Sequence, residues 1–262
     1  MAGLDERKIP TLDLDVTDST CTEAMRRAVA GERGPLWITA RCQSAGRGRS
    51  GRSWTTPQGN LAATLLLTPR CPPRALAGLS VVAGVAVYDA IAPFLIQPSG
   101  EVVPSLRLKW PNDVMVAGAK LSGTLIESST LGADTVVAIG IGINVAAAPD
   151  VPGRAVTALA QHGTAPSPEA LGCSLLGRLA AWIEVWDRGA GFPMIRQAWL
   201  ERAGPPGEAV SVNTGNATVW GTFAGLDEDG ALRIADARTG RVSRVTFGDV
   251  SIGSEPPANQ GP

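Results

Sequence analysis

Histidines and paired cysteines are scarce in this sequence, and their scarcity argues against two kinds of site. The 262 residues include one histidine, His162, and none of the four cysteines, Cys21, Cys42, Cys71 and Cys173, forms a C-x-x-C pair. A zinc site therefore has too few ligands at a suitable spacing, and no metal ligands can be named. A Ser-His-Asp triad would depend entirely on His162, whose Gln-His-Gly-Thr surroundings are typical of a polar loop.

An excess of one charge is also absent. The chain has 23 lysines and arginines against 24 aspartates and glutamates, for a net charge of -1, and 44% of its residues are hydrophobic. This composition indicates a globular protein and argues against one whose whole surface binds nucleic acid. The first twenty residues contain no apolar run typical of a secretory signal. We therefore expect a cytoplasmic protein whose cysteines are free thiols.

One segment, 76–96, is long and apolar enough to cross a membrane. It has a single charged residue, Asp89, and it is rich in alanine, glycine and serine. Asp89 and Pro93 both fall in its last third, and no basic residue follows before Arg107. These features favour a buried helix of the core, and we expect no membrane partner.

Turn-forming residues are abundant, which favours a fold that contains a sheet. The chain has 31 glycines and 20 prolines, more than is typical of a helical bundle. Strands are predicted at 36–40, 61–68, 106–109, 114–116, 121–127 and 136–145, the last four in consecutive antiparallel order. With helices on one side of this sheet, the expected fold class is α+β.

Two helices have clear start signals. Thr20 and Glu23 match a capping box for a helix that ends near Gly31. Ser167 and Pro168 are typical of an N-cap and a first helical position, and apolar residues then recur every three or four positions as far as Trp186.

The Gly-Pro-Pro-Gly break at 204–207 divides the chain into unequal parts. A length of 262 residues suits one large domain with a smaller satellite. We expect a catalytic domain at 1–204, a small β-barrel of short strands at 205–253, and a disordered tail at 254–262.

The sequence Gly46-Arg47-Gly48-Arg49-Ser50-Gly51 matches the dinucleotide-binding pattern G-x-G-x-x-G, but its context is wrong. No helix can start through Pro57, and no acidic residue occurs between residues 34 and 88. The same acid-free window holds Arg41, Arg47, Arg49, Arg52, Arg70 and Arg74. Guanidinium groups interleaved with glycines can surround a phosphate, so we interpret the loop as an anion site, the alternative being a solvated loop.

A second constellation combines Lys109, Asp113 and Lys120 with Trp110 and Gly123. In a strand-turn-strand unit Asp113 and Lys120 can face each other across a hairpin and enter one pocket; a surface ion pair is the alternative. In Gly140-Ile141-Gly142-Ile143-Asn144, two glycines interrupt an apolar strand, which suggests close packing or the approach of a ligand.

Taken together, these segments resemble the biotin protein ligases. The motifs are Ser19-Thr20, Gln43-x-x-Gly46-Arg47-Gly48-Arg49-x-Gly51-Arg52-x-Trp54, Lys109-Trp110-Pro111-Asn112-Asp113, Lys120-Leu121-x-Gly123 and Gly140-Ile141-Gly142-Ile143-Asn144. The resemblance covers residues 15 to 250. It implies a class II synthetase-like catalytic domain, with a seven-stranded mixed, mainly antiparallel sheet backed by helices, and a small SH3-like barrel.

The resemblance implies an ATP-dependent ligase that activates biotin as biotinyl-5'-AMP and transfers it to a lysine of a biotin carboxyl carrier protein. Mg²⁺ would bridge the triphosphate. Catalytic roles fall on Lys120, Arg47 and Asp113. Biotin and ATP would be bound by Ser19, Thr20, Cys21, Gln43, Gly46, Arg47, Gly48, Arg49, Arg52, Trp54, Lys109, Trp110, Asn112, Lys120, Gly123 and Asn144. Cys21 stands where the family has Asn, and Ser50 where a basic residue is common.

Two rival functions are a lipoate ligase or octanoyltransferase, whose architecture is similar, and a non-catalytic nucleotide-binding or nucleic-acid-binding protein. The arginine-glycine loop favours biotin. Only about 18 residues precede Thr20, too few for the helix-turn-helix domain of bifunctional relatives, so a monofunctional ligase without specific DNA binding is expected, as a monomer or homodimer.

Overall fold

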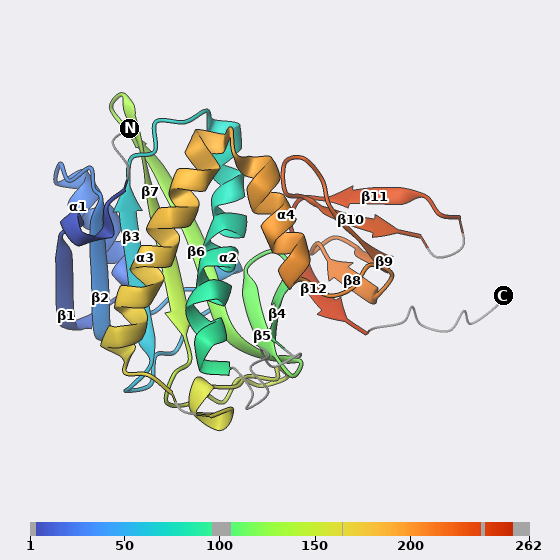
Figure 1. The fold of residues 1–262 in the computed structure, drawn as a ribbon, viewed down its shortest axis with the longest axis horizontal. Helices are drawn as coiled ribbons and strands as arrows, with labels where there is room; N and C mark the ends of the chain where they lie inside the picture. Colours follow the sequence, from blue (N-terminus) through green and yellow to red (C-terminus); the bar gives the residue numbers. More distant parts are fainter. Residues whose placement is uncertain (1–3, 96–105, 164, 237–238, 254–262) are drawn as a thin grey trace.

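The computed structural model describes residues 4–95, 106–163, 165–236 and 239–253, which form a mixed seven-stranded sheet, four α-helices and a second, five-stranded sheet (Figure 1). The tail expected at 254–262 lies outside the described residues. The first sheet has the strand order β1-β2-β3-β7-β6-β5-β4. Its strands are β1 (Thr11–Thr17), β2 (Leu36–Gln43), β3 (Leu61–Leu67), β4 (Leu106–Lys109), β5 (Asp113–Val116), β6 (Ala119–Leu131) and β7 (Asp134–Ile143).

Only the β1–β2 pair in this sheet is parallel, and every other neighbouring pair is antiparallel. The expectation of a mixed, mainly antiparallel sheet is confirmed, including the consecutive strands β4 to β7. No strand was predicted at β1, although its Leu-Asp-Leu-Asp alternation has the period of a strand with one buried face.

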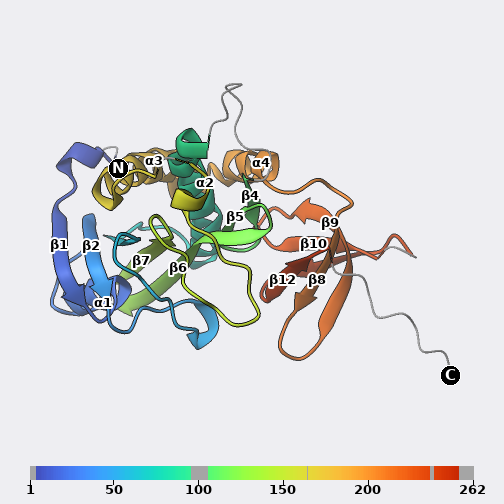
Figure 2. The same cartoon turned by 90° about the horizontal axis from the view of Figure 1, so that it is seen from below.

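Helices cover the two faces of this sheet unequally. The helices α2 (Leu79–Ile91), α3 (Pro168–Trp186) and α4 (Phe192–Arg202) lie on one face, and α1 (Thr20–Val29) lies on the other (Figure 2). Successive residues of a strand point to opposite faces of the sheet. Ile139 and Ile141 of β7 therefore point toward α2, whereas Gly140 and Gly142 point to the α1 side. The α1 side is therefore left partly open, next to the glycines.

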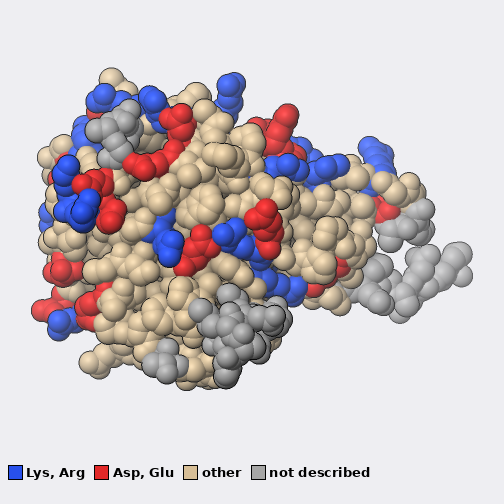
Figure 3. All heavy atoms as spheres, viewed as in Figure 1, with Lys and Arg blue, Asp and Glu red and all other residues tan. Residues whose placement is uncertain are grey.

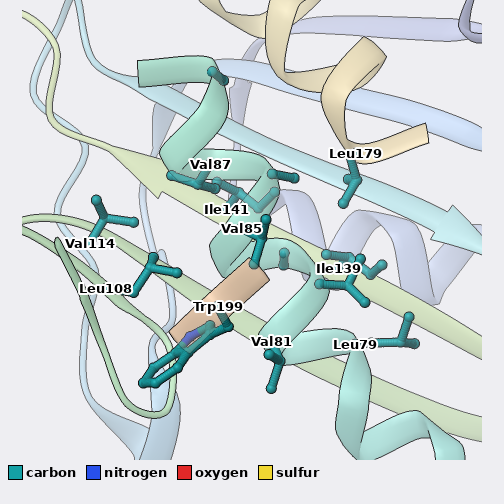
Figure 4. Close-up of a cluster of buried hydrophobic side chains, with 14 of the residues drawn as sticks. Leu79, Val81, Val85, Val87, Leu108, Val114, Ile139, Ile141, Leu179 and Trp199 are labelled. Carbon is teal, nitrogen blue, oxygen red and sulfur yellow. The ribbon is translucent and has the colours of Figure 1, made fainter. Parts of the chain in front are cut away.

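The main core lies between the sheet and helices α2 to α4 (Figure 4). Its buried side chains include Leu79, Val81, Val85, Val87, Leu108, Val114, Ile139, Ile141, Leu179 and Trp199. Residues 73–95 are long and apolar enough to cross a membrane, but 61% of their most apolar stretch is buried inside the protein. The expected core helix is thus confirmed over α2. Its charge, Asp89, accepts hydrogen bonds from Trp182 Nε1 and Arg202 Nε, both at 2.9 Å.

The two predicted helix starts have different outcomes. Ser167 is the N-cap of α3, and its hydroxyl accepts a hydrogen bond from the Ala170 amide, as expected. The capping box at α1 is wrong. The N-cap is Ser19, the Thr20 hydroxyl is engaged by other side chains, and Glu23 pairs with Arg26 and Arg27.

The smaller sheet has the order β11-β10-β9-β8-β12 and corresponds to the small barrel expected after the Gly-Pro-Pro-Gly break. Its strands are β8 (Ala209–Asn213), β9 (Thr218–Leu226), β10 (Leu232–Ala235), β11 (Val242–Val245) and β12 (Asp249–Ile252). Strand β4 and the turn after it hold it to the larger sheet: Arg107 pairs with Glu208 at 2.7 Å, and Trp110 Nε1 donates to the Gly230 carbonyl at 3.0 Å.

The face formed by α2 to α4 carries acidic and basic side chains interspersed (Figure 3). It shows no extended area of positive charge, in agreement with the balanced composition.

Candidate active site

A pocket of about 660 Å³ opens on the α1 side of the large sheet. Its lining comes from the start of α1, the loop at 47–55, strands β4 to β7, the segment at 149–156 and strand β12. Figure 2 shows the two sheets side by side with the 44–60 loop beneath the larger one. Every candidate binding or catalytic residue named from the sequence lines this pocket except Gly46.

The inner end of the pocket is a buried polar network around Thr20. The Thr20 amide and hydroxyl both donate to Gln43 Oε1, at 2.9 and 3.2 Å, and Gln43 Nε2 donates to the Thr56 hydroxyl at 3.0 Å. The Thr64 hydroxyl donates to Thr20 Oγ1 at 2.8 Å. Because each group is held by a buried neighbour, this end presents fixed donors and acceptors to a small uncharged polar ligand.

Cys21 stands beside this network and is 4% exposed. Its Sγ lies 3.5 Å from the Thr64 hydroxyl, and burial raises the pKa of the thiol to about 11, although the Thr64 hydrogen bond opposes the change. Cys21 is therefore a neutral side chain at neutral pH. No disulfide involves any of the four cysteines, as expected.

The two glycines of β7 make room for the pocket's inner walls. A Cβ at Gly140 would overlap Cys21 Sγ, and a Cβ at Gly142 would overlap the indole of Trp54. On β6, a Cβ at Gly123 would lie 2.9 Å from Lys120 Nζ and 3.3 Å from the Trp54 ring. Close packing is thus confirmed as the reason for glycine in this strand.

A carboxylate bound by two ammonium groups also lines the pocket. Asp113 Oδ1 is 2.6 Å from Lys120 Nζ, and Asp113 Oδ2 is 3.1 Å from Lys109 Nζ. The register explains this arrangement: Lys109 pairs with Asp113, and Asp113 pairs with Gly123, so all three point to the pocket side. A bulge between Val114 and Met115 then brings Lys120 back to that side.

The two ammonium groups keep the buried Asp113 carboxylate in its charged form. Burial alone would raise the pKa of Asp113, but Lys120 and then Lys109 outweigh it and hold that pKa below its ordinary value. Lys120 Nζ also lies 5.5 Å from the centre of the Trp54 ring, within reach of a cation–π contact. One carboxylate faces two ammonium groups here, so the triad carries a net positive charge and attracts an anion.

Three arginines of the 47–55 loop also line the pocket, and two of them are paired with carboxylates. Arg47 pairs with Glu127 at 2.7 Å, Arg52 pairs with Asp249, and Arg49 donates to Asn112 Oδ1 at 3.1 Å. Burial lowers the pKa of Arg49, and the charge of Asp113 opposes this. The arginines expected to form a local anion site thus line the pocket, and anion binding stays a prediction.

Three residues predicted to bind substrate also have structural roles. Gly46 lies behind the pocket, where a side chain would clash with the Trp54 backbone and with Gln43. Trp110 is 5% exposed, and its indole N–H donates a hydrogen bond to the Gly230 carbonyl. Asn144 is 1% exposed, and its Nδ2 donates to the Thr157 carbonyl at 3.0 Å.

Sequence reasoning missed a large part of the lining. It includes Arg107 and Met115 of the hairpin, Thr124 and Leu125 of β6, the segment 149–156 and the residues Asp249, Val250, Ser251 and Ile252. The register of β5 and β6 would have found Met115 and Leu125, but nothing local marks the last two segments. His162, 2.7 Å from the Thr157 hydroxyl, does not line the pocket.

Metal ligands are few among the described residues, where no group of three histidine, cysteine, aspartate or glutamate side chains could hold a metal ion. Three aspartates line the pocket: Asp113 and Asp249 are each paired with a cation, and Asp150 is the third. A divalent ion would thus depend mainly on ligands that a substrate brings with it.

Two protein-family models match this chain. The family model for the biotin/lipoate A/B protein ligase family matches residues 14–144, and the model for the biotin protein ligase C terminal domain matches residues 207–253. The biotin-[acetyl-CoA-carboxylase] ligase of Paracoccus denitrificans is 44% identical over 82% of this chain and 90% of its own length. The ligase of the same name from Mycobacterium tuberculosis is 34% identical over 89% of this chain and 85% of its own.

Among solved structures, the chain resembles the biotin protein ligase from Aquifex aeolicus in complex with biotin and ATP. The TM-score is 0.75 at 27% sequence identity, with 93% of this chain and 98% of that chain covered.

Proposed function

This chain belongs to the biotin/lipoate A/B protein ligase family, and we propose that its pocket joins biotin to ATP through Lys120, Arg47 and Asp113. The protein is an ATP-dependent biotin protein ligase. The observation that supports these roles is the meeting, in one pocket, of a neutral polar recess at Thr20 with a cationic middle at Lys120. Biotin has both a neutral polar head and a carboxylate.

In the first step an oxygen of the biotin carboxylate attacks the α-phosphorus of ATP. The bond from that phosphorus to the bridging oxygen breaks, pyrophosphate leaves with the electron pair, and biotinyl-5'-AMP forms without a proton transfer. Two anions must approach each other, and their repulsion is about 4 kcal/mol at 4 Å and intermediate dielectric. Lys120 and Arg47 offset this repulsion, and Asp113 orients the Lys120 ammonium through its 2.6 Å contact.

In the second step the neutral amine of a carrier-protein lysine attacks the carbonyl carbon of the mixed anhydride. An amide forms, AMP leaves, and the attacking nitrogen loses a proton. The names of the two relatives indicate that the acceptor is a biotin-carrying protein of acetyl-CoA carboxylase. We propose a biotin carboxyl carrier domain as the partner of this chain.

The remaining substrate contacts follow from position. Ser19, Thr20, Cys21 and Gln43 would bind the uncharged head of biotin, and Trp54 would cover it. Arg49, Arg52, Lys109 and Asn112 would bind the phosphates, and Gly48 and Gly123 leave backbone open to the ligands. Mg²⁺ would enter with ATP as part of the substrate, held by phosphate oxygens, since the described pocket offers few free carboxylates.

Biotin-dependent exchange of labelled pyrophosphate into ATP tests this function. Exchange with biotin, and none with lipoate or octanoate, is the expected result; exchange with lipoate instead would favour the lipoate ligase alternative. A nucleotide-binding protein without catalysis would show no exchange with any acid. Transfer of labelled biotin to a carrier domain then tests the partner.

We propose three further properties. The chain divides into a ligase domain at 1–204 and a barrel at 205–253, it works in the cytoplasm as a monomer or homodimer, and it binds no specific DNA. A sequence-specific gel shift that strengthens with biotin and ATP would contradict the last of these. We expect no such shift, because the acid-free basic loop is used for nucleotide and the chain as a whole has a net charge of -1.

A further inference from the structure

We propose that Arg154 joins Arg49 and Arg52 in a binding site for the β- and γ-phosphates of ATP, and that Asp249 of the smaller domain competes with these phosphates for Arg52. The inference rests on the proposed function, and it adds two residues from segments that carry no recognisable motif. All four side chains line the same pocket.

The first argument is the uneven pairing of the lining cations. Arg47 and Arg107 have carboxylate partners in Glu127 and Glu208, at 2.7 Å each. Among the described residues, Arg154 has no ion pair, and Arg49 has only the neutral Asn112 amide. Guanidinium groups gathered without enough counter-charge are most stable with a polyanion between them.

The second argument is the position of Arg154 in the chain. The segment that carries it runs beside Lys120: the Lys120 amide donates to the Ala155 carbonyl at 2.8 Å, and the Thr157 amide donates to the Lys120 carbonyl at 2.9 Å. Arg154 therefore directly precedes Ala155, which is hydrogen-bonded to the backbone of Lys120. A phosphate chain whose α-phosphate meets Lys120 has its outer phosphates within reach of this segment.

The third argument is the direction in which pyrophosphate must leave the pocket. The biotin end of the pocket is buried at Thr20 and Cys21, whereas Arg154 is exposed and the side chains of Arg52 and Asp249 are 36% and 47% exposed. Pyrophosphate must leave through an open side. Cations on that side hold the leaving group during reaction without enclosing it.

Electrostatic coupling supports the same grouping. Burial is the largest cause of the lowered pKa of Arg52, and the positive charges of Arg154 and then Arg49 lower it further. Like charges that disfavour one another in this way gain when a phosphate enters between them. Asp249 is paired with Arg52 in the structure, and it occupies the guanidinium that a phosphate would otherwise take.

The test compares variants that remove a positive or a negative charge, and it measures both pyrophosphate binding and the kinetics of exchange. Arg154→Ala should weaken the binding of pyrophosphate, measured by isothermal titration calorimetry without biotin, about tenfold, and should raise KM for ATP in the exchange reaction by a similar factor. The KM for biotin should stay within about twofold. Arg154→Lys should recover part of the loss, and Asp249→Asn should tighten pyrophosphate binding because it frees Arg52.

Arg178→Ala, an exposed arginine of α3 outside the pocket, is the matched control and should change neither readout. Unchanged pyrophosphate binding in Arg154→Ala, or an equal rise in KM for ATP and biotin, would overturn the assignment of Arg154. Weaker binding in Asp249→Asn would overturn the competition. Failure of the proposed function is distinct, because it would abolish exchange in the wild-type protein while the calorimetric comparison remained decisive.

Discussion

Replacing Lys120 by alanine should remove adenylate formation and leave the fold intact. Its ammonium is 2.6 Å from Asp113, and in the proposed function it neutralises the biotin carboxylate and the α-phosphate as they approach each other. A unit charge about 4 Å from another contributes about 4 kcal/mol at an effective dielectric near 20. At about 1.4 kcal/mol for each factor of ten, exchange should fall by roughly three orders of magnitude.

The cost in stability should be small. A buried carboxylate that loses its only cation destabilises a protein by about 3 to 5 kcal/mol, but Asp113 keeps Lys109 at 3.1 Å. The three side chains are also 12 to 22% exposed, so water screens part of the interaction. We expect a loss of about 1 kcal/mol, which for a chain of this size lowers Tm by about 3 °C.

The assay is biotin-dependent pyrophosphate exchange at saturating biotin and ATP, with Tm measured on the same samples. Lys120→Met is the matched variant, because it keeps an apolar stem beside Trp54 and removes only the charge. Equal losses in Lys120→Ala and Lys120→Met would locate the effect in the ammonium. More than about a tenth of wild-type exchange in either variant would refute the role given to Lys120.

Three other predictions follow from the pocket walls. Gly142→Ala should displace the Trp54 indole, raising KM for biotin and costing about 1 to 3 kcal/mol of stability; unchanged binding would contradict the packing argument. Tryptic cleavage within 46–54 should slow when biotin and ATP are both present, and equal rates with and without them would count against ligand-dependent ordering of the arginine loop. Because the folded pKa of Cys21 is raised to about 11, its contribution to stability is fully present below the unfolded pKa and is lost as pH rises toward 11. Between pH 8.5 and 10.5 the free energy of unfolding, measured with urea, should therefore fall more in the wild type than in Cys21→Ser. An identical fall in both proteins would show that the thiol does not titrate in this way.

The residues predicted from the sequence are those whose chemistry is local. A hairpin places neighbouring strands side by side, which is enough to predict that Asp113 and Lys120 can meet, and their 2.6 Å contact confirms it. Likewise Pro57 excludes the helix that a dinucleotide fold needs, and the structure has no α-helix between α1 and α2. Such inferences need no knowledge of the tertiary fold.

Elements set by tertiary contacts were missed. Strand β1 pairs in parallel with β2 across α1, and no local turn indicates that pairing. The capping box at Thr20 failed because its hydroxyl has better partners in Gln43 and Thr64, both distant in sequence. Helix α4 has no side-chain hydrogen bond at its N-cap, so its sequence gives little sign of where it begins. Its packing against α2 and α3 stabilises it instead.

The smaller domain is the clearest case of a contribution that local patterns cannot reveal. Strand β12 brings Asp249 to the pocket because contacts with the larger domain hold the second sheet in place, among them Arg107 with Glu208 and Trp110 with Gly230. Arg107 and Trp110 thus belong both to the ligand pocket and to the contact between domains. A ligand that displaced either side chain would act on contacts that also position Asp249 against Arg52.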